Sequence, residues 1–208
     1  MKKFIDTLKT PALHRRLIIL GAAKKLAYAG FFAFTMMTTP AEARDYTIDY
    51  GASKIEFSGT HADNPFKGSF GEWTAEITFD PANIETSKIV ATFKPDSAKT
   101  GDAMYDGTLP QTDWFNTKEH PQATFASTTV RDNEGGGYIA DGNLTIRGIT
   151  KPVQLAFTLS DLEQSPVTAK GSLTINRLDF DLGKKSDGDA EWVSREIKID
   201  ITLVATPK

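Results

Sequence analysis

The sequence predicts an all-β fold of eight antiparallel strands with one short helical insertion. Three observations support this prediction. Apolar and polar residues alternate from Tyr46 onward, turn-forming residues interrupt the alternation at short intervals, and residues 102–114 lack it. A period of two is typical of antiparallel strands that bury one face. Eight such strands within residues 44–208 indicate a closed barrel or a sandwich, and closure of a barrel removes the exposed strand edges through which molecules aggregate.

Most of the predicted strands have apolar residues at every second position, and turn-forming residues such as Pro, Gly and Asp separate them. The predicted strands are residues 55–57, 73–79, 89–93, 125–130, 138–146, 153–159, 167–175 and 193–203. Side chains at alternate positions of a strand point to opposite faces, so the apolar set should face the interior. The residues expected to line the interior are Phe57, Trp73, Ile77, Phe79, Phe93, Leu144, Phe157 and Ile199.

The apolar positions change parity in two places. They are even at Phe66, Gly68 and Phe70 and odd from Trp73 to Phe79, so a bulge or bend near Gly71 is predicted. They are odd up to Ile175 and even from Leu178, which predicts a second bent strand. Long bent strands let a small barrel curve and close, and they imply an elongated interior.

A short helical insertion is predicted between the third and fourth strands. Residues 102–106 follow Thr100-Gly101 in the manner of a helix start, and Leu109-Pro110 ends the helix. A second helical turn is predicted over residues 113–118. This insertion should lie over one mouth of the barrel.

The N-terminal segment has the anatomy of a secretory signal peptide. Residues 1–43 contain seven Lys or Arg and two acids, a net charge of +5, and two apolar blocks at 17–23 and 26–37. Neither block reaches the roughly 18–20 apolar residues of a membrane-spanning helix. The small residues of Ala41-Glu42-Ala43 favour cleavage before Arg44, which leaves an exported domain of residues 44–208. An uncleaved amphipathic anchor is the alternative.

Composition excludes several classes of function. Of the 24 basic and 27 acidic residues, 17 and 25 remain in residues 44–208, a net charge of −8. An acidic body disfavours binding of nucleic acid. The absence of cysteine excludes disulfides, thiolate catalysis and Cys-ligated metal sites.

No catalytic residues, metal site or cofactor site are predicted. Residues 44–208 contain two histidines, His61 and His120, and both are interpreted as solvated loop residues because a histidine metal site normally uses three protein ligands. The nucleophile elbow and the Gly-rich phosphate-binding patterns are missing. The dispersed carboxylates are the one feature that favours an enzyme.

Two arginines lie at apolar-parity positions, Arg177 and Arg195. A buried guanidinium requires an anion or another acceptor, because an unpaired buried charge is very costly. One interpretation is an internal ion pair with an acid such as Asp179 or Glu196, or a position at the rim. The other is that one of them, Arg177 foremost, binds the polar head of a bound amphiphile.

Several stretches together resemble the YceI-like family of exported polyisoprenoid-binding proteins. The most specific is residues 142–153, Gly-Asn-Leu-Thr-Ile-Arg-Gly-Ile-Thr-Lys-Pro-Val. The others are Tyr46-Thr47-Ile48-Asp49, Gly68-Ser69-Phe70-Gly71, Phe79-Asp80-Pro81, Asp113-Trp114-Phe115-Asn116, Lys118-Glu119-His120-Pro121, Phe125-Ala126-Ser127 and Asn176-Arg177-Leu178-Asp179-Phe180. The resemblance spans essentially all of residues 44–208.

The resemblance implies a lipocalin-like barrel with an apolar tunnel, located in the periplasm and without enzymatic activity. The implied ligand is a polyprenyl quinone, a polyprenyl phosphate or a fatty-acid-like lipid, with no nucleic acid partner; transient membrane contact and a homodimer stay open. Combined with the interior positions and the insertion, the expected ligand-binding residues are Phe57, Phe70, Trp73, Ile77, Phe79, Phe93, Met104, Tyr105, Trp114, Phe115, Leu144, Phe157, Arg177 and Ile199.

Three functional hypotheses follow. The first is a carrier, storage or scavenging protein for a single-chain lipid. The second is an enzyme that acts on such a lipid. The third is a stress-related structural barrel without a dedicated ligand, whose interior is filled by its own side chains.

Overall fold

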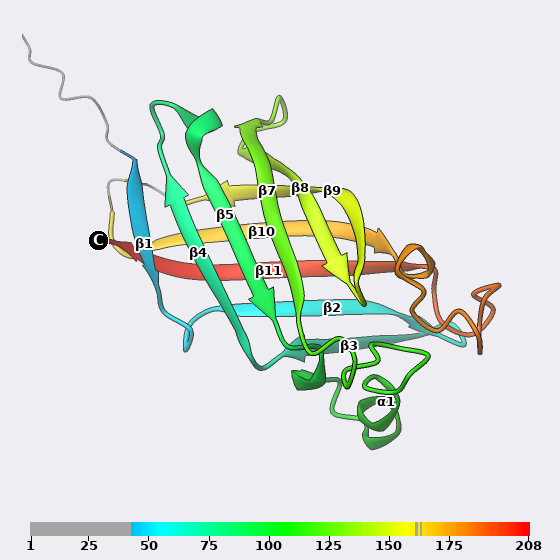
Figure 1. Ribbon diagram of the computed structural model, residues 1–208. Coiled ribbons are helices and arrows are strands. Elements are labelled where there is room, and N and C mark those ends of the chain that lie inside the picture. The colour runs from blue at the N-terminus through cyan, green and yellow to red at the C-terminus, as the bar shows by residue number, and fades with distance from the viewer. Residues whose placement is uncertain (1–42, 161, 163) are drawn as a thin grey trace, which may run out of the picture. The chain divides into compact units, whose positions relative to one another are not determined.

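The computed structural model describes residues 43–208 except 161 and 163 (Figure 1). The predicted signal peptide, residues 1–43, lies outside the described residues apart from Ala43. None of the helices in the described part has the length and hydropathy of a membrane-spanning segment.

The described residues form eleven β-strands, one α-helix and three short 3₁₀ helices. The strands are β1 (Arg44–Ile48), β2 (Lys54–His61), β3 (Asn64–Phe70), β4 (Trp73–Phe79), β5 (Lys88–Phe93), β6 (Ala98–Lys99), β7 (Ala123–Asp132), β8 (Tyr138–Ile146), β9 (Ile149–Leu159), β10 (Val167–Asn176) and β11 (Glu196–Pro207). The helices are η1 (Ile84–Thr86), η2 (Pro95–Ser97), α1 (Ala103–Thr108) and η3 (Arg177–Phe180).

Eight strands close an antiparallel barrel, which confirms the predicted fold class. The ring runs β1-β4-β5-β7-β8-β9-β10-β11 and closes where β1 pairs with β11, for example Ile48 opposite Ala205. The 12-residue strand β11 also pairs with β2, where Ile201 lies opposite Ile55. Strands β3 and β6 continue this branch. The barrel is therefore extended beyond the ring on one side.

The strands of the closed ring are not the eight that were predicted. The ring contains β1, whereas the strand predicted at residues 55–57 lies in the branch, within β2. Strand β1 (RDYTI) is short and mostly polar, β3 contains Pro65 and Gly68, and β6 has two residues. Strands β1 and β6 have no alternation long enough to be recognised, because β propensity and periodicity need several consecutive residues to be informative. The alternation at Phe66, Gly68 and Phe70 was assigned to one bent strand with residues 73–79, whereas it forms the separate strand β3.

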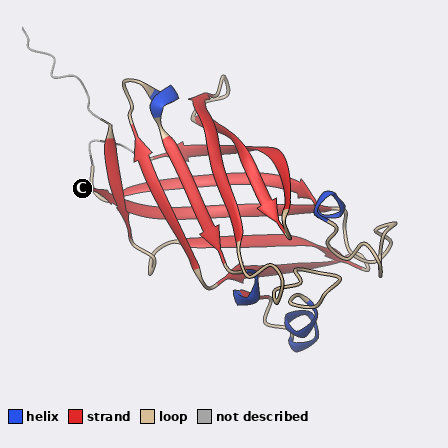
Figure 2. Ribbon diagram, viewed as in Figure 1, coloured by secondary structure: helices blue, strands red, loops and turns tan. Residues whose placement is uncertain are grey.

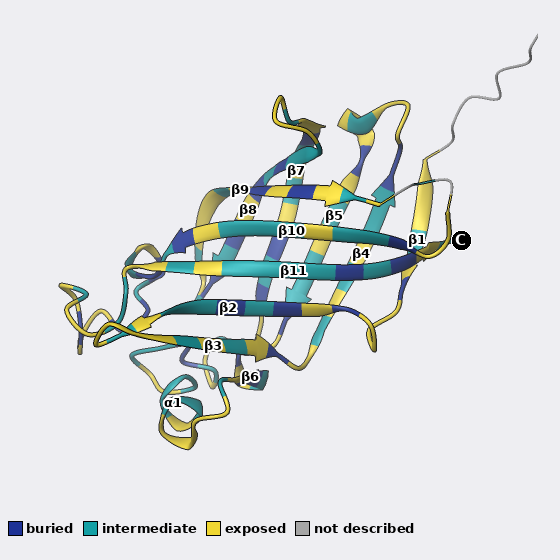
Figure 3. Ribbon diagram, turned by 180° about the vertical axis from the view of Figure 1, so that it is seen from behind, coloured by how far each residue is buried: buried dark blue, intermediate teal, exposed yellow. Residues whose placement is uncertain are grey.

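The strands form two groups that cross. The axes of β4, β5, β7 and β8 are roughly aligned, with neighbouring strands antiparallel. The axes of β9, β10, β11, β2 and β3 cross them on the far side in the view of Figures 1 and 2. Buried and less buried residues alternate along the strands (Figure 3), as the period of two requires. The inward side chains of the two groups form the core between them.

The core confirms all eight predicted interior positions. The buried cluster contains Phe57, Phe79, Phe93, Leu144 and Phe157, and Trp73 and Ile199 pack against it. Ile77 packs against a smaller cluster of Ile48, Leu203 and Ala205.

The first parity change corresponds to the predicted bend in the chain. The second was also predicted to be a bend in a strand, but the structure has a 3₁₀ helix there. Strand β3 ends at Phe70 and β4 begins at Trp73, so the chain bends at residues 71–72. After β10, the chain forms the 3₁₀ helix η3 in place of the predicted bent strand. The Asn176 side chain accepts a hydrogen bond from Leu178 N and Asp181 adopts a φ of 55°, so local side-chain capping favours the helix.

The insertion contains one helix where two helical turns were predicted. Helix α1 begins after Asp102, whose carboxylate accepts hydrogen bonds from Met104 N and Tyr105 N. Residues 113–118 form hydrogen-bonded turns and no second helix. Asp113 accepts hydrogen bonds from Lys185 N and Ser186 N, so its side chain serves a distant loop.

The β8–β9 hairpin explains the most specific motif of the sequence. Its two-residue turn, Arg147 and Gly148, has φ values of 52° and 74°, as a type I′ turn requires. Arg147 donates hydrogen bonds to the carbonyl oxygens of Thr112, Asp113 and Asp181. The arginine therefore ties the hairpin to the insertion and to the loop after η3.

Candidate functional site: two apolar cavities and a buried ion pair

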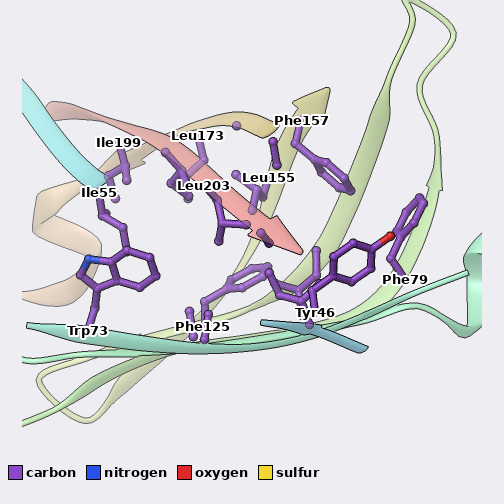
Figure 4. A pocket seen from close by; sticks show the side chains of 18 of the residues that line it. Tyr46, Ile55, Trp73, Phe79, Phe125, Leu155, Phe157, Leu173, Ile199 and Leu203 are labelled. Carbon is purple, nitrogen blue, oxygen red and sulfur yellow. The ribbon is translucent and has the colours of Figure 1, made fainter. Parts of the chain in front are cut away.

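An apolar cavity of about 140 Å³ lies between the two crossing groups of strands, and we call it the main cavity because all eight strands of the ring line it. Every strand of the ring contributes to its wall, because each presents apolar side chains inward (Figure 4). The wall consists of Tyr46, Ile55, Phe70, Trp73, Ala75, Ile77, Phe79, Ile89, Ala91, Phe93, Phe125, Leu144, Leu155, Phe157, Leu159, Leu162, Val167, Ala169, Gly171, Leu173, Ile199, Ile201, Leu203 and Ala205.

The main cavity can bind an apolar chain but offers no partner for a charge. Among its described lining residues, the Tyr46 hydroxyl and the Trp73 indole N–H are the only side-chain polar groups. Burial raises the pKa of the Tyr46 hydroxyl above its ordinary value, and the charge of Arg44 opposes this in part. Burying a methylene group contributes about 0.8 kcal/mol, whereas water in such a cavity finds too few hydrogen-bond partners. A slender hydrocarbon chain suits this space.

A second chamber of about 210 Å³ lies where β2 and β3 meet α1. We use this name for the cavity lined by Phe57, His61, Phe66, Thr100, Met104, Tyr105, Thr108, Leu109, Trp114 and Val193. Its wall differs from that of the main cavity because it contains a polar pair, in which the Tyr105 hydroxyl lies 3.0 Å from His61 Nδ1. The two rings meet edge to face with centroids 5.4 Å apart.

The role of His61 was missed by sequence reasoning. It was interpreted as a solvated loop residue, but it is the last residue of β2, is half-buried and forms part of the second chamber. Its partner Tyr105 is 44 residues away in α1. No local pattern links the two, because only the packing of the insertion against β2 and β3 brings them together.

An aromatic pair separates the two cavities. Phe70 lines the main cavity, Phe57 lines the second chamber, and their ring centroids are 5.2 Å apart. The Phe57 ring lies directly over Gly68, where an added Cβ would come within 2.2 Å of Phe57 Cζ. Gly68 therefore makes room for the ring that divides the interior.

Arg177 belongs to an internal ion pair. It is 1% exposed, and its Nη2 lies 2.6 Å from Asp187 Oδ2. The guanidinium also donates hydrogen bonds to the carbonyl oxygens of Leu182, Asp187, Val193 and Ser194. The sequence left this role open, but its suggested partners, Asp179 and Glu196, were wrong. We call Arg177, Asp187 and these carbonyl groups the Arg177–Asp187 cluster.

The position of Arg177 does not support contact with a ligand head. It lines neither cavity, and the Trp114 ring, which does line the second chamber, lies 5.6 Å from the guanidinium carbon. Burial lowers the pKa of Arg177 and the charge of Asp187 opposes this, but an arginine stays protonated in proteins. The positive charge of Arg177 is therefore balanced by the Asp187 carboxylate inside the cluster.

Asp187 organises the loop between η3 and β11. Its carboxylate accepts hydrogen bonds from the backbone N–H groups of Glu191, Trp192 and Val193. Burial alone would raise the pKa of Asp187, but these N–H groups and the charge of Arg177 outweigh it and hold the pKa below the ordinary range. The loop so fixed places Val193 in the wall of the second chamber.

The parity of Arg195 predicted an inward side chain, but the structure places this side chain at the surface. It is exposed, and its Nη2 donates to the carbonyl oxygen of Asp189 at 3.3 Å. Strand β11 begins one residue later, at Glu196, so the alternation of the strand does not extend to Arg195.

The structure divides the predicted ligand-binding residues between the two cavities. Those that line the main cavity are Phe70, Trp73, Ile77, Phe79, Phe93, Leu144, Phe157 and Ile199. Those that line the second chamber are Phe57, Met104, Tyr105 and Trp114, of which Met104 is 64% exposed. Phe115 is buried against Phe70, and Arg177 lies in its own cluster. No group of metal-ligating side chains occurs among the described residues.

Comparison with known proteins decides the family. The model of the YceI-like domain matches residues 46–205, which is most of the chain. The chain belongs to the YceI-like family. This confirms the resemblance carried by residues 142–153 and the shorter motifs.

Relatives and solved structures agree with this assignment. A UPF0312 protein of Pectobacterium carotovorum is 33% identical over 143 residues, which cover 69% of this chain and 71% of the relative. The crystal structure of BcnA from Burkholderia cenocepacia superposes with a TM-score of 0.72 at 32% identity and covers 77% of this chain and 100% of its own. A polyisoprenoid-binding domain from Saccharophagus degradans shares the fold, with a TM-score of 0.59 at 16% identity over 78% of this chain and 98% of its own.

Proposed function

We propose that this protein binds one long-chain isoprenoid or fatty-acid-like amphiphile inside the barrel, as a carrier, storage or scavenging protein exported to the periplasm. The observation that carries the proposal is the main cavity, whose wall is built from apolar side chains of every strand in the ring. A long tail gains free energy from each buried methylene group without any polar contact. Polyprenyl quinones, polyprenyl phosphates and fatty-acid-like lipids all have such a tail.

A structural barrel without a ligand is a weaker explanation. The interior contains large aromatic residues, yet a cavity of about 140 Å³ persists between them. Protein interiors are close-packed, and each unfilled volume costs stability through lost contacts. A cavity maintained by so many strands therefore favours a dedicated occupant. The fold is compatible with this ligand class, since a domain of the same fold is described as polyisoprenoid-binding.

An enzymatic role has less support. A hydrolase or transferase needs an acid, a base or a nucleophile within hydrogen-bond reach of its substrate. The described lining residues of the main cavity include no carboxylate, histidine, serine or lysine, and membership of the YceI-like family favours binding over catalysis. The dispersed carboxylates of the sequence lie outside this wall.

The test is extraction of lipid from protein purified out of the periplasm, followed by mass spectrometry. We expect one class of long-chain lipid at a substoichiometric to equimolar ratio in the wild type. Ala91→Phe, which fills part of the main cavity, should reduce the ratio severalfold. Ala126→Phe is the matched control, because Ala126 is exposed on the neighbouring strand β7.

The same preparation tests export. N-terminal sequencing should find Arg44 as the first residue of the periplasmic protein, and a chain that retains residues 1–43 would contradict cleavage. Protein that carries no lipid, or that carries it equally with Phe at position 91, would contradict the proposed function.

A further inference from the structure

The second chamber contains one pair of polar side chains that is available to a ligand. Four of its lining residues have polar side chains: His61, Thr100, Tyr105 and Thr108. The Thr100 hydroxyl bonds to the Asp106 carboxylate, and the Thr108 hydroxyl donates to the Met104 carbonyl oxygen. The Tyr105 hydroxyl and His61 Nδ1 bond only to each other in the described structure, and a hydroxyl can take part in a further hydrogen bond.

The His61–Tyr105 pair can form a hydrogen bond with a ligand group that donates or with one that accepts. When His61 Nδ1 is unprotonated, Tyr105 donates to it and its oxygen lone pairs can accept from a ligand hydroxyl. When Nδ1 carries the proton, it donates to the Tyr105 oxygen, and the phenolic hydrogen is free for a ligand carbonyl. The pair therefore adapts to both kinds of neutral oxygen.

The same chamber is poorly suited to an anion. No lysine or arginine is among its described lining residues, and the Arg177 guanidinium, which lies 5.6 Å from the Trp114 ring, is paired with Asp187. The carboxylate of Asp106 on α1 is held by Thr100 in the chamber wall, and the charge of Lys99 acts on this carboxylate, so that lysine is already matched by an acid. A phosphate or carboxylate there would lose its hydration without gaining a counter-ion, which is costly.

The place of the chamber suits a ligand head. The Phe70 ring in the wall of the main cavity and the Phe57 ring in the wall of the chamber pack against each other, at 5.2 Å between centroids. A tail that fills the main cavity and displaces this contact would bring its end beside Tyr105. The exposed Met104 at the chamber rim places this end of the interior near solvent, where a head enters or leaves.

We propose that the His61–Tyr105 pair binds the polar head of the amphiphile and that the second chamber selects a neutral hydroxyl or carbonyl over an anionic head. This inference rests on the proposed function, since it assumes a tail in the main cavity. Tyr105 and His61 are then specificity-determining residues, and Arg177 acts on the chamber indirectly, through the loop that contributes Val193 and through its contact with Trp114.

The test compares three probes with the same long isoprenoid tail: an alcohol, its monophosphate and the hydrocarbon that lacks the oxygen. Binding is followed by tryptophan fluorescence, because Trp114 and Trp73 lie in the two walls. The variants are Tyr105→Phe and His61→Leu. Tyr46→Phe is the matched control, because it removes a hydroxyl from the wall of the main cavity instead.

The wild type should bind the alcohol more tightly than the monophosphate. Tyr105→Phe should weaken alcohol binding roughly two- to tenfold, the range of one hydrogen bond, and should leave the hydrocarbon unchanged. His61→Leu should act in the same direction, and Tyr46→Phe should not change the preference. Tighter binding of the monophosphate, or equal loss for alcohol and hydrocarbon in both variants, would overturn the inference while the proposed function stands. Failure of all three probes to bind the wild type would overturn both.

Discussion

The main cavity and the Arg177–Asp187 cluster are both removed from water, but they are stabilised in opposite ways. The wall of the main cavity is held by apolar burial, which depends on area and little on direction. The cluster is held by an ion pair and by hydrogen bonds from one guanidinium to four carbonyl groups. An apolar wall tolerates side chains of similar volume, whereas a buried charge needs every partner in place.

The two regions of the barrel therefore differ in how much structural change they tolerate. The wall can adjust to ligands that differ in shape, because no directional contact is lost when a side chain moves. The cluster fixes the loop after η3, so that Val193 forms part of the second chamber. Substitutions should therefore have graded effects in the cavity wall and all-or-none effects in the cluster.

The largest effect is expected for Asp187→Ala, which leaves Arg177 buried without its counter-ion. Removal of one partner of a buried ion pair costs about 3–5 kcal/mol of the free energy of unfolding. Urea denaturation of the domain measures this cost. The matched control is Glu72→Ala, since Glu72 and Lys94 are also 2.6 Å apart but are mostly exposed. It should cost about 1 kcal/mol or less, and similar costs for the two variants would contradict the contrast.

Ile77→Glu is expected to have the next largest effect. Ile77 lines the main cavity, where a carboxylate finds no cation among the described lining residues and loses its hydration, so the substitution should cost about 2–3 kcal/mol and raise the pKa of the new carboxyl group. Thr74→Glu on the exposed face of the same strand is the control. Thermal unfolding at neutral pH compares them. Equal melting temperatures for the two variants would show that position 77 does not face an apolar space.

Gly68→Ala tests the partition between the two cavities. The added methyl group would overlap the Phe57 ring, and overpacking of this kind costs about 1–3 kcal/mol. Gly107→Ala is the control within α1, where a Cβ meets no atom within 4 Å and alanine favours the helix by about 1 kcal/mol. Chemical denaturation should therefore give shifts of opposite sign. Stabilisation by Gly68→Ala would show that Phe57 has free space to move.

The smallest expected effect is a pH dependence that arises from Asp187. Its pKa is lower in the folded protein than in the unfolded chain, so between the two values the unfolded chain binds more protons. The stabilisation is complete above the ordinary carboxyl pKa of about 4 and is lost as the pH falls through the folded value. Denaturation between pH 7 and pH 3 measures this loss.

Other carboxyl groups with lowered pKa values, including Asp113, Asp141 and Asp181, contribute to the same acid destabilisation. Asp187→Asn isolates the share of Asp187, because only that group stops titrating. The variant should lose less stability on acidification than the wild type does. Parallel curves would mean that Asp187 has the same pKa in both states.

The predicted fold was accurate where the alternation was long. Residues 73–79, 138–146 and 153–159 lie within β4, β8 and β9, because several consecutive inward residues outweigh local exceptions. Strands β1 and β6 were missed because each is too short to show a period. Residues 178–182 were assigned to a strand on parity alone, but Asn176 caps a 3₁₀ helix there, and a local hydrogen bond outweighed the periodicity.

The candidate site was predicted only in its apolar part. Parity identified the wall residues, and Leu155, Leu173 and Leu203 could have been added by the same rule. The polar partners could not be identified, since His61 and Tyr105, like Arg177 and Asp187, meet through loops whose path has no sequence period. The sequence alone indicated that Arg177 needs an anion, but it offered several acids and no means to choose among them.

The sequence by itself determined the antiparallel all-β class and which faces of the strands are buried, because both depend on a period of two that repeats along the chain. The motif around Arg147-Gly148 indicated the family, and with it the barrel rather than a sandwich. Only the tertiary structure decided that the interior is divided at Phe57 and Phe70, that Arg177 pairs with Asp187, and that His61 meets Tyr105. The physical reason is that burial depends on how many apolar neighbours a residue has, which a pattern can predict. A hydrogen bond or an ion pair depends on the distance between two particular atoms, which is set only when loops and strands far apart in the sequence pack together.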